Sequence, residues 1–82
     1  MNYLPVVTDA KYIGNYQIEV EFSNGEKRLA DCEPWLNGEI FQPLRDPAYF
    51  RQFFVDGWTV AWPNGADIAP ETLYEDGQKL AS

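Results

Sequence analysis

The chain has 82 residues, which is enough for one small domain and leaves no room for a second hydrophobic core. Thirteen acidic and six basic residues give a formal net charge of −7, which disfavours direct binding to nucleic acid and to anionic membranes. Hydrophobic residues make up 45% of the chain and aromatic residues 16%, so the composition predicts a folded domain rather than a disordered one.

The first predicted element is a strand over residues 4–13, where the apolar residues follow no helical rhythm. Pro5 is expected at the start of this strand or on a sheet edge, because proline has no amide proton for the strand ladder. Residues 16–22 alternate apolar and polar side chains. That period of two predicts a strand with one buried face and one solvent face.

The dipeptide Asn24-Gly25 follows this strand and predicts a two-residue hairpin turn, since both residue types tolerate positive φ. Residues 27–32 then form the return strand. In this register Glu21 lies opposite Arg28 on the solvent face, as a cross-strand pair of opposite charge. The turn therefore fixes the expected register of the sheet.

The middle of the chain predicts a loop and then the main helix. Glu33-Pro34 ends the return strand, and residues 35–36 are expected to fold over the end of the sheet. Residues 39–44 form a short extended stretch. Asp46 and Pro47 have the residue types of a helix N-cap and first helical position, which predicts a helix over residues 47–53 with an aromatic face against the sheet.

A second hairpin is predicted over residues 53–62, with Asp56-Gly57 as its turn and with Trp58 and Trp62 on one face. The run Pro63-Asn64-Gly65 gives a further turn. Pro70 then begins a short C-terminal helix over residues 70–75. The tail, residues 76–82, has little to bury and is expected to fray.

These elements predict an α+β fold. It consists of a small, mostly antiparallel sheet, made of two hairpins and an N-terminal strand, with one main helix packed on it and a short C-terminal helix. Residues 1–75 form the single domain.

The single cysteine, Cys32, excludes an internal disulfide, and a chain without histidine cannot build Ser-His or Cys-His catalytic pairs or the usual histidine-containing zinc sites. No apolar run approaches the ~20 residues of a membrane span. The start, residues 1–5, has neither the basic residues nor the apolar run of a signal peptide. We therefore expect a cytoplasmic protein.

The order of these motifs resembles the bacterial domain of unknown function 2442 family, as a short stand-alone member. The residues that carry the resemblance are 16–22, 24–26, 31, 44–47, 50 and 62–74, and the block from Trp62 to Tyr74 is the most specific. The resemblance implies a small α+β domain with an antiparallel sheet and no established activity. Some relatives carry an added helix-turn-helix domain, which this sequence lacks. Others are encoded beside another small uncharacterised protein, in arrangements suspected to be toxin and antitoxin pairs.

Three carboxylates are candidates for a catalytic or metal-binding role. Asp67 and Glu71 are four residues apart around a helix start and, with Asp31, are the residue types of an acid–base pair or a divalent-cation site. The favoured interpretation is structural: Asp67 and Glu71 stabilise a helix N-terminus, and Asp31 caps the turn at Pro34 or bonds the loop over residues 63–67. We therefore expect no catalytic, cofactor-binding or metal-binding residue and no cofactor.

Other candidates have a functional and a structural interpretation as well. Cys32 is a redox thiol or, as favoured, a small buried hydrophobe. The tryptophans also have two interpretations, stacking on a ligand or packing in the core, and the second is favoured for Trp35, Trp58 and Trp62. The residues expected to be structural signatures are Asn24, Gly25, Asp31, Asp46, Pro47, Trp62, Pro63, Asn64, Gly65, Asp67, Pro70 and Glu71.

The sequence thus predicts a non-enzymatic protein-interaction module, in an antitoxin-like role. The expected partner is another protein, favoured to be basic and encoded nearby, and the edge of the first strand is the expected contact, with a homodimer as the simplest outcome when that partner is missing. Two alternatives stay open. One is a carboxylate-based metal-dependent enzyme, and the other is a ligand-sensing domain related to those fused to a helix-turn-helix.

Overall fold

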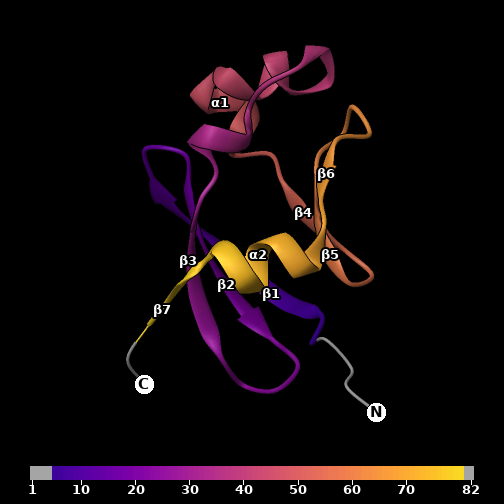
Figure 1. Ribbon diagram of the computed structural model, residues 1–82. Coiled ribbons are helices and arrows are strands. Elements are labelled where there is room, and N and C mark those ends of the chain that lie inside the picture. The colour runs from indigo at the N-terminus through magenta and orange to yellow at the C-terminus, as the bar shows by residue number, and fades with distance from the viewer. Residues whose placement is uncertain (1–4, 81–82) are drawn as a thin grey trace.

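Two antiparallel sheets form the frame of the protein in the computed structural model, which describes residues 5–80 (Figure 1). The four-stranded sheet has the order β1-β2-β3-β7, with β1 at Val7–Gly14, β2 at Gln17–Phe22, β3 at Lys27–Asp31 and β7 at Gln78–Lys79. The three-stranded sheet has the order β4-β5-β6, with β4 at Phe54–Asp56, β5 at Thr59–Ala61 and β6 at Asp67–Ile68. The helical elements are the 3-10 helices η1 (Glu33–Trp35) and η2 (Glu39–Arg45) and the α-helices α1 (Pro47–Phe50) and α2 (Pro70–Asp76).

The α+β class is therefore confirmed, while two details differ. The strands form two sheets rather than one. The expected main helix over residues 47–53 is a single turn, α1, and the two longest helical elements are η2 and α2, with seven residues each. After Phe50 the chain reaches Phe53 and Phe54, residue types that favour strands, and Phe54 opens β4 instead of extending the helix.

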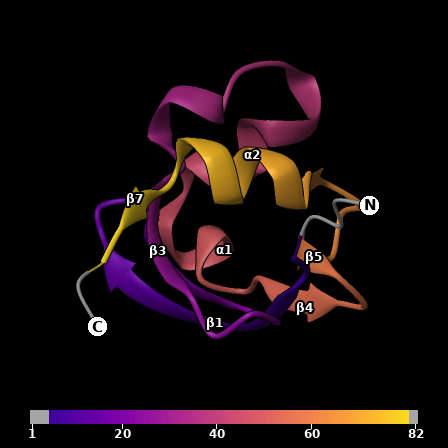
Figure 2. The same cartoon turned by 60° about the horizontal axis from the view of Figure 1, so that its bottom comes forward.

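The second sheet lies against the first at β1. β4 and β5 both contact β1, and the Val7 amide donates to the Trp58 carbonyl at 2.9 Å. Figure 2 shows the strands curving around one side of the molecule, with α2 lying across the other. β1 is the end strand of its own sheet, as the sequence suggested, and β4 and β5 lie close to it. Leu4, the expected first residue of this strand, lies outside the described residues.

One core joins the two sheets and the helices, because each contributes to the same buried cluster. Phe50 lies at its aromatic centre, with ring centroids 5.3 Å from Tyr16 and 5.5 Å from Trp62. The largest fully buried side chains are Trp62, Phe22, Phe50, Ile18, Leu36, Leu44, Leu73, Val7, Val20, Val60 and Cys32.

Two loops in this fold have the same construction. In the loop after β2, Gly25 N–H donates to Phe22 and the Phe22 amide donates to the Glu26 carbonyl, both at 2.9 Å. In the loop after β5, Gly65 N–H donates to Trp62 at 3.0 Å and the Trp62 amide donates to Ala66 at 2.8 Å. The glycines have φ of 87° and 91°. Each is thus a three-residue hairpin loop that ends in a left-handed glycine.

This loop length corrects the predicted register. Gly25 has the positive φ that was expected, but Asn24 does not, so the turn contains three residues instead of two. The pairing shifts by one residue: Glu21 lies opposite Lys27, and Arg28 lies opposite the buried Val20. Because a one-residue shift moves a side chain to the other face of a strand, Arg28 lies on the inner face of the sheet instead of the solvent face.

A strained turn connects β1 and β2. Asn15 and Tyr16 both have positive φ, 51° and 62°, and Gly14 pairs with Gln17 across them. A bulky side chain rarely adopts this conformation. Here the Tyr16 hydroxyl donates to the Arg45 carbonyl, and the Tyr16 ring meets the edge of Phe50. These contacts hold the turn against η2 and α1.

Three further segments differ from expectation. Residues 39–44, expected to be extended, lie in the 3-10 helix η2. The turn between β4 and β5 consists of Gly57 and Trp58, one residue later than predicted, because Asp56 already pairs with Thr59. The tail that was expected to fray contributes Asp76 to α2 and pairs β7 with β3, although residues 81–82 lie outside the description.

Candidate functional site

Trp58 is the most exposed large hydrophobic residue in the described part of the chain, with 64% of its surface accessible. It occupies the second position of the β4–β5 turn, after Gly57 with φ of 68°, so its side chain leaves the sheet instead of joining the core. Val6 is 37% exposed and directly precedes Val7, whose amide donates to the Trp58 carbonyl. We name Val6 and Trp58 the Trp58 patch. The interpretation of Trp58 as a core residue is therefore wrong.

Two exposed acidic residues, Asp9 and Asp56, lie within three residues of this patch in the sequence. Asp56 is exposed two residues before Trp58. On β1 the exposed Asp9 lies opposite Glu21, which places two like charges across from each other. Such pairs destabilise a sheet slightly, and Lys27 on β3, which lies opposite Glu21 on the other side, offsets part of this charge.

The signature residues around Trp62 connect neighbouring elements of the fold. Trp62 is 1% exposed, and its indole Nε1–H donates to the Phe50 carbonyl at 2.8 Å. Asn64 accepts from the Ala66 amide at 3.1 Å and donates to the Ile40 carbonyl at 2.9 Å. The loop over residues 62–66 therefore ties β5 to α1 and η2, and the interpretation of Trp62 as a core residue is confirmed.

The helix-start predictions have mixed outcomes. Asp46 caps α1 by accepting from the Ala48 amide at 3.1 Å, and Pro47 stands at the first position, as expected. Pro70 likewise begins α2, with Glu71 in its first turn. Asp67, however, lies in β6, and the N-cap of α2 is Ala69, which makes no side-chain cap bond.

The carboxylates of Asp31, Asp67 and Glu71 do not form a shared site. Asp31 accepts from the Glu33 amide at 3.2 Å and so caps the turn at Pro34, as one of its two structural interpretations predicted. Asp67 and Glu71 are exposed on β6 and α2. Over residues 5–80 the structure contains no group of three Cys, Asp or Glu side chains arranged to hold a metal ion.

Cys32 is buried, which confirms its interpretation as a small hydrophobe. Burial, together with the charge of neighbouring Asp31, raises the pKa of the Cys32 thiol to about 12. The reactive thiolate is therefore scarce at neutral pH, and redox chemistry at this residue is disfavoured.

A polar network around Glu26 was not anticipated from the sequence. The Glu26 carboxylate accepts from the Tyr74 hydroxyl and from Asn24, and forms ion pairs with Arg28 at 3.4 Å and Lys79 at 3.5 Å. The hydrogen bond from Tyr74 is the main cause that lowers the pKa of Glu26 to about 2, helped by Asn24 and Arg28 against the opposing effect of burial. The network fastens α2 and β7 to the β2–β3 hairpin.

Arg28 completes this network from the inner face of the sheet. Its guanidinium donates to the Tyr74 carbonyl at 2.7 Å and lies 4.2 Å from the centroid of the Tyr74 ring. The predicted register placed Arg28 in solvent, so this contact could not be anticipated from the residue pattern. The loop after β2 has three residues instead of the predicted two, and this difference places Arg28 on the inner face.

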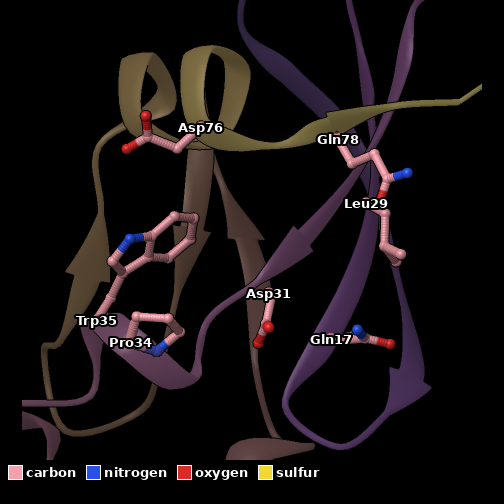
Figure 3. Close-up of a pocket in the computed structure, with 7 residues that line it drawn as sticks. All are labelled: Gln17, Leu29, Asp31, Pro34, Trp35, Asp76 and Gln78. Atoms are coloured by element: carbon pink, nitrogen blue, oxygen red, sulfur yellow. The ribbon is translucent and has the colours of Figure 1, made fainter.

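A cleft of about 360 Å³ opens beside β3, and neither Val6 nor Trp58 lines it (Figure 3). Figure 3 shows the Trp35 ring on one side, with Asp76 beside it at the end of α2, Asp31 near the centre, and Leu29 and Gln78 opposite. Of the three tryptophans only Trp35 lines it, so the structure does not assemble the aromatic stacking site weighed above.

None of the helices in the described part of the chain has the length and apolarity needed to cross a membrane. A comparison with protein-family models matches residues 7–79 to the family described as "Protein of unknown function (DUF2442)". Comparisons with curated proteins and with solved structures found no match.

Proposed function

This chain belongs to the DUF2442 family, and we propose that it acts as a non-enzymatic protein-interaction module that binds a partner protein through the Trp58 patch. The exposure of Trp58 is the observation that carries this proposal. The same chain buries Trp62 to 1% exposure and half-buries Trp35, yet leaves 64% of Trp58 in solvent. Tryptophan is enriched among the residues that dominate binding energy at protein interfaces.

The position of Trp58 suits a binding role. The two-residue turn holds its backbone, and the bond from Val7 to its carbonyl fixes that turn against β1. A side chain displayed from a fixed backbone loses less freedom on binding than one displayed from a mobile loop. Replacing it removes contact surface without touching the buried core.

The charge of the protein favours a basic partner. The net charge of −7, with the exposed Asp9 and Asp56 close in sequence to Val6 and Trp58, attracts and orients a positively charged surface. An antitoxin-like component that neutralises a basic protein encoded nearby fits this chemistry, and we place that function in the cytoplasm. A homodimer through the edge of the first strand is the simplest outcome when that partner is missing, because β1 is the end strand of its sheet.

The test is isothermal titration of the purified chain with the protein encoded beside it. We expect saturable binding that Trp58→Ser weakens by at least about 30-fold, the loss typical of a hot-spot residue. The matched control is Ile40→Ser, because Ile40 is also an exposed apolar residue, at 49%, but lies on η2. Equal binding by the parent and Trp58→Ser, or no binding by the parent, would refute the proposal. Sedimentation at low and high salt shows whether the chain self-associates instead.

A further inference from the structure

The cleft beside β3 arises because β7 covers only part of that strand. β7 pairs with β3 at Arg28 and Leu29, and the Leu80 amide donates to the Lys27 carbonyl at 3.2 Å. In an antiparallel ladder alternate residues direct their N–H and C=O groups to the same neighbour. Leu29 and Asp31 therefore face the same side as Lys27. β7 begins only at Gln78, after Gly77 connects it to α2, so no strand of the described residues pairs with Asp31 on this side. The backbone of Asp31 therefore faces the cleft.

The lining of this cleft is rich in hydrogen-bond acceptors. Asp31 and Asp76 contribute carboxylates, Gln17 and Gln78 contribute amide oxygens, and Asp31 adds its backbone carbonyl. No Lys or Arg is among the residues that line it. One Asp31 oxygen accepts from the Glu33 amide at 3.2 Å, which holds this carboxylate in place at the strand end. The site thus has negative charge that no lining residue neutralises.

Trp35 supplies a flat apolar wall. The ring is half-buried and packs against the core from the end of η1, and Figure 3 shows it at one side of the cleft, below Asp76. An indole face attracts a cation, and a planar guanidinium also stacks on it. Arginine has five N–H donors in one plane, so it can stack on Trp35 and donate to several acceptors at once. An ammonium group has fewer donors and cannot stack.

We propose that this cleft is a second binding site, which takes the guanidinium group of an arginine side chain presented by a partner protein. The guanidinium lies on Trp35 and donates to the carboxylates of Asp31 and Asp76. The choice of a protein as the source of the arginine rests on the proposed function, whereas the guanidinium site stands on the cleft itself. The cleft and the Trp58 patch share no residue, so each can fail without the other.

The first experiment titrates the ¹⁵N-labelled chain with n-propylguanidinium and, in parallel, with its neutral isostere n-propylurea, followed by NMR. We expect saturable shifts of the Trp35 indole N–H and of the Gln17 and Gln78 side-chain amides with the guanidinium alone. Equal shifts with the urea, or no shifts up to tens of millimolar, would overturn the site.

Variants then assign the contacts. Asp76→Asn removes an exposed carboxylate at a helix end, so it keeps the fold and should weaken guanidinium binding about threefold. Asp31→Asn keeps the oxygen that caps Glu33, and the double variant should abolish binding. Asp9→Asn, with its carboxylate on β1, and Trp58→Ser are controls that should bind as the parent does. Unchanged binding in the double variant refutes the assignment.

A last comparison identifies the source of the guanidinium. Blocked arginine, N-acetylarginine methylamide, has the backbone of an arginine inside a protein, whereas free arginine has a charged amine and carboxylate. We expect the blocked form to bind at least as tightly as free arginine. Binding of free arginine about tenfold more tightly would assign the site to a small molecule and overturn the choice of a protein.

Discussion

Alanine substitution at three glycines separates two physical causes of instability. Gly25 and Gly65 have φ of 87° and 91°, and a Cβ added to either would meet no atom within 4 Å. The cost there is purely conformational, about 1–2 kcal/mol for an L-residue in the left-handed region. Loss of unfolded-state freedom offsets roughly 0.5 kcal/mol of it, which leaves about 1 kcal/mol at each site. The two variants should therefore be destabilised equally.

Gly77 should behave differently. Its φ of −70° suits any residue, but a Cβ would lie 2.3 Å from the Leu73 carbonyl oxygen and 3.0 Å from Cβ of Arg28. The backbone between α2 and β7 must move to admit it, at a cost of about 2 kcal/mol, in the range for overpacked sites. Gly77→Ala should therefore be the most destabilised of the three variants.

The assay is urea unfolding followed by tryptophan fluorescence. With a slope of about 1 kcal/mol per M, typical of small domains, Gly25→Ala and Gly65→Ala should lower the midpoint by about 1 M and Gly77→Ala by about 2 M. A synthetic chain with D-alanine at position 25 should unfold no earlier than the parent, because D-residues favour positive φ. An unchanged midpoint for Gly25→Ala, or equal losses for L- and D-alanine, would show that the loop is not left-handed.

Three further outcomes follow from the polar and titratable groups. The folded pKa of Glu26, about 2, lies below its ordinary value of 4.5. Its contribution to stability is therefore complete above about pH 4.5 and is lost as the pH falls toward 2. Glu26→Gln should remove this part of the acid dependence of stability, whereas the control Glu39→Gln should not. Cys32 should react with Ellman's reagent only on unfolding, because it is buried with a pKa of about 12; rapid labelling of the native chain would contradict this. Calorimetric titration with magnesium, manganese and calcium should show no binding, and Asp67→Asn should unfold at the parent midpoint; micromolar binding lost in that variant would favour the enzyme alternative.

The local signals in the sequence predicted most elements but not how they meet. Alternation over residues 16–22 and the pair Asp46-Pro47 predicted β2 and the start of α1, because strand period and helix capping are local properties. Asn24-Gly25 also predicted a turn with a left-handed glycine. Packing on both strands decides whether such a turn contains two or three residues, and here it contains three.

That one-residue difference explains why the Glu26 network was missed. It moves Arg28 to the inner face, where Tyr74, 46 residues later in the chain, can receive its guanidinium. The conformation of Tyr16 was also unpredictable from local preference, since a tyrosine with φ of 62° depends on its contacts with Arg45 and Phe50. The exposure of Trp58 followed from the same kind of cause, a hairpin turn displaced by one residue.

We propose that the exposed Trp58 binds a partner protein, and titration of the neighbouring gene product against matched variants measures this binding. Trp58→Ser and Ile40→Ser should both stay folded, because the two residues are 64% and 49% exposed and neither belongs to the buried core. We predict that Ile40→Ser binds as the parent does and that Trp58→Ser binds at least about 30-fold more weakly. Indistinguishable affinities for the parent and both variants would contradict the claim.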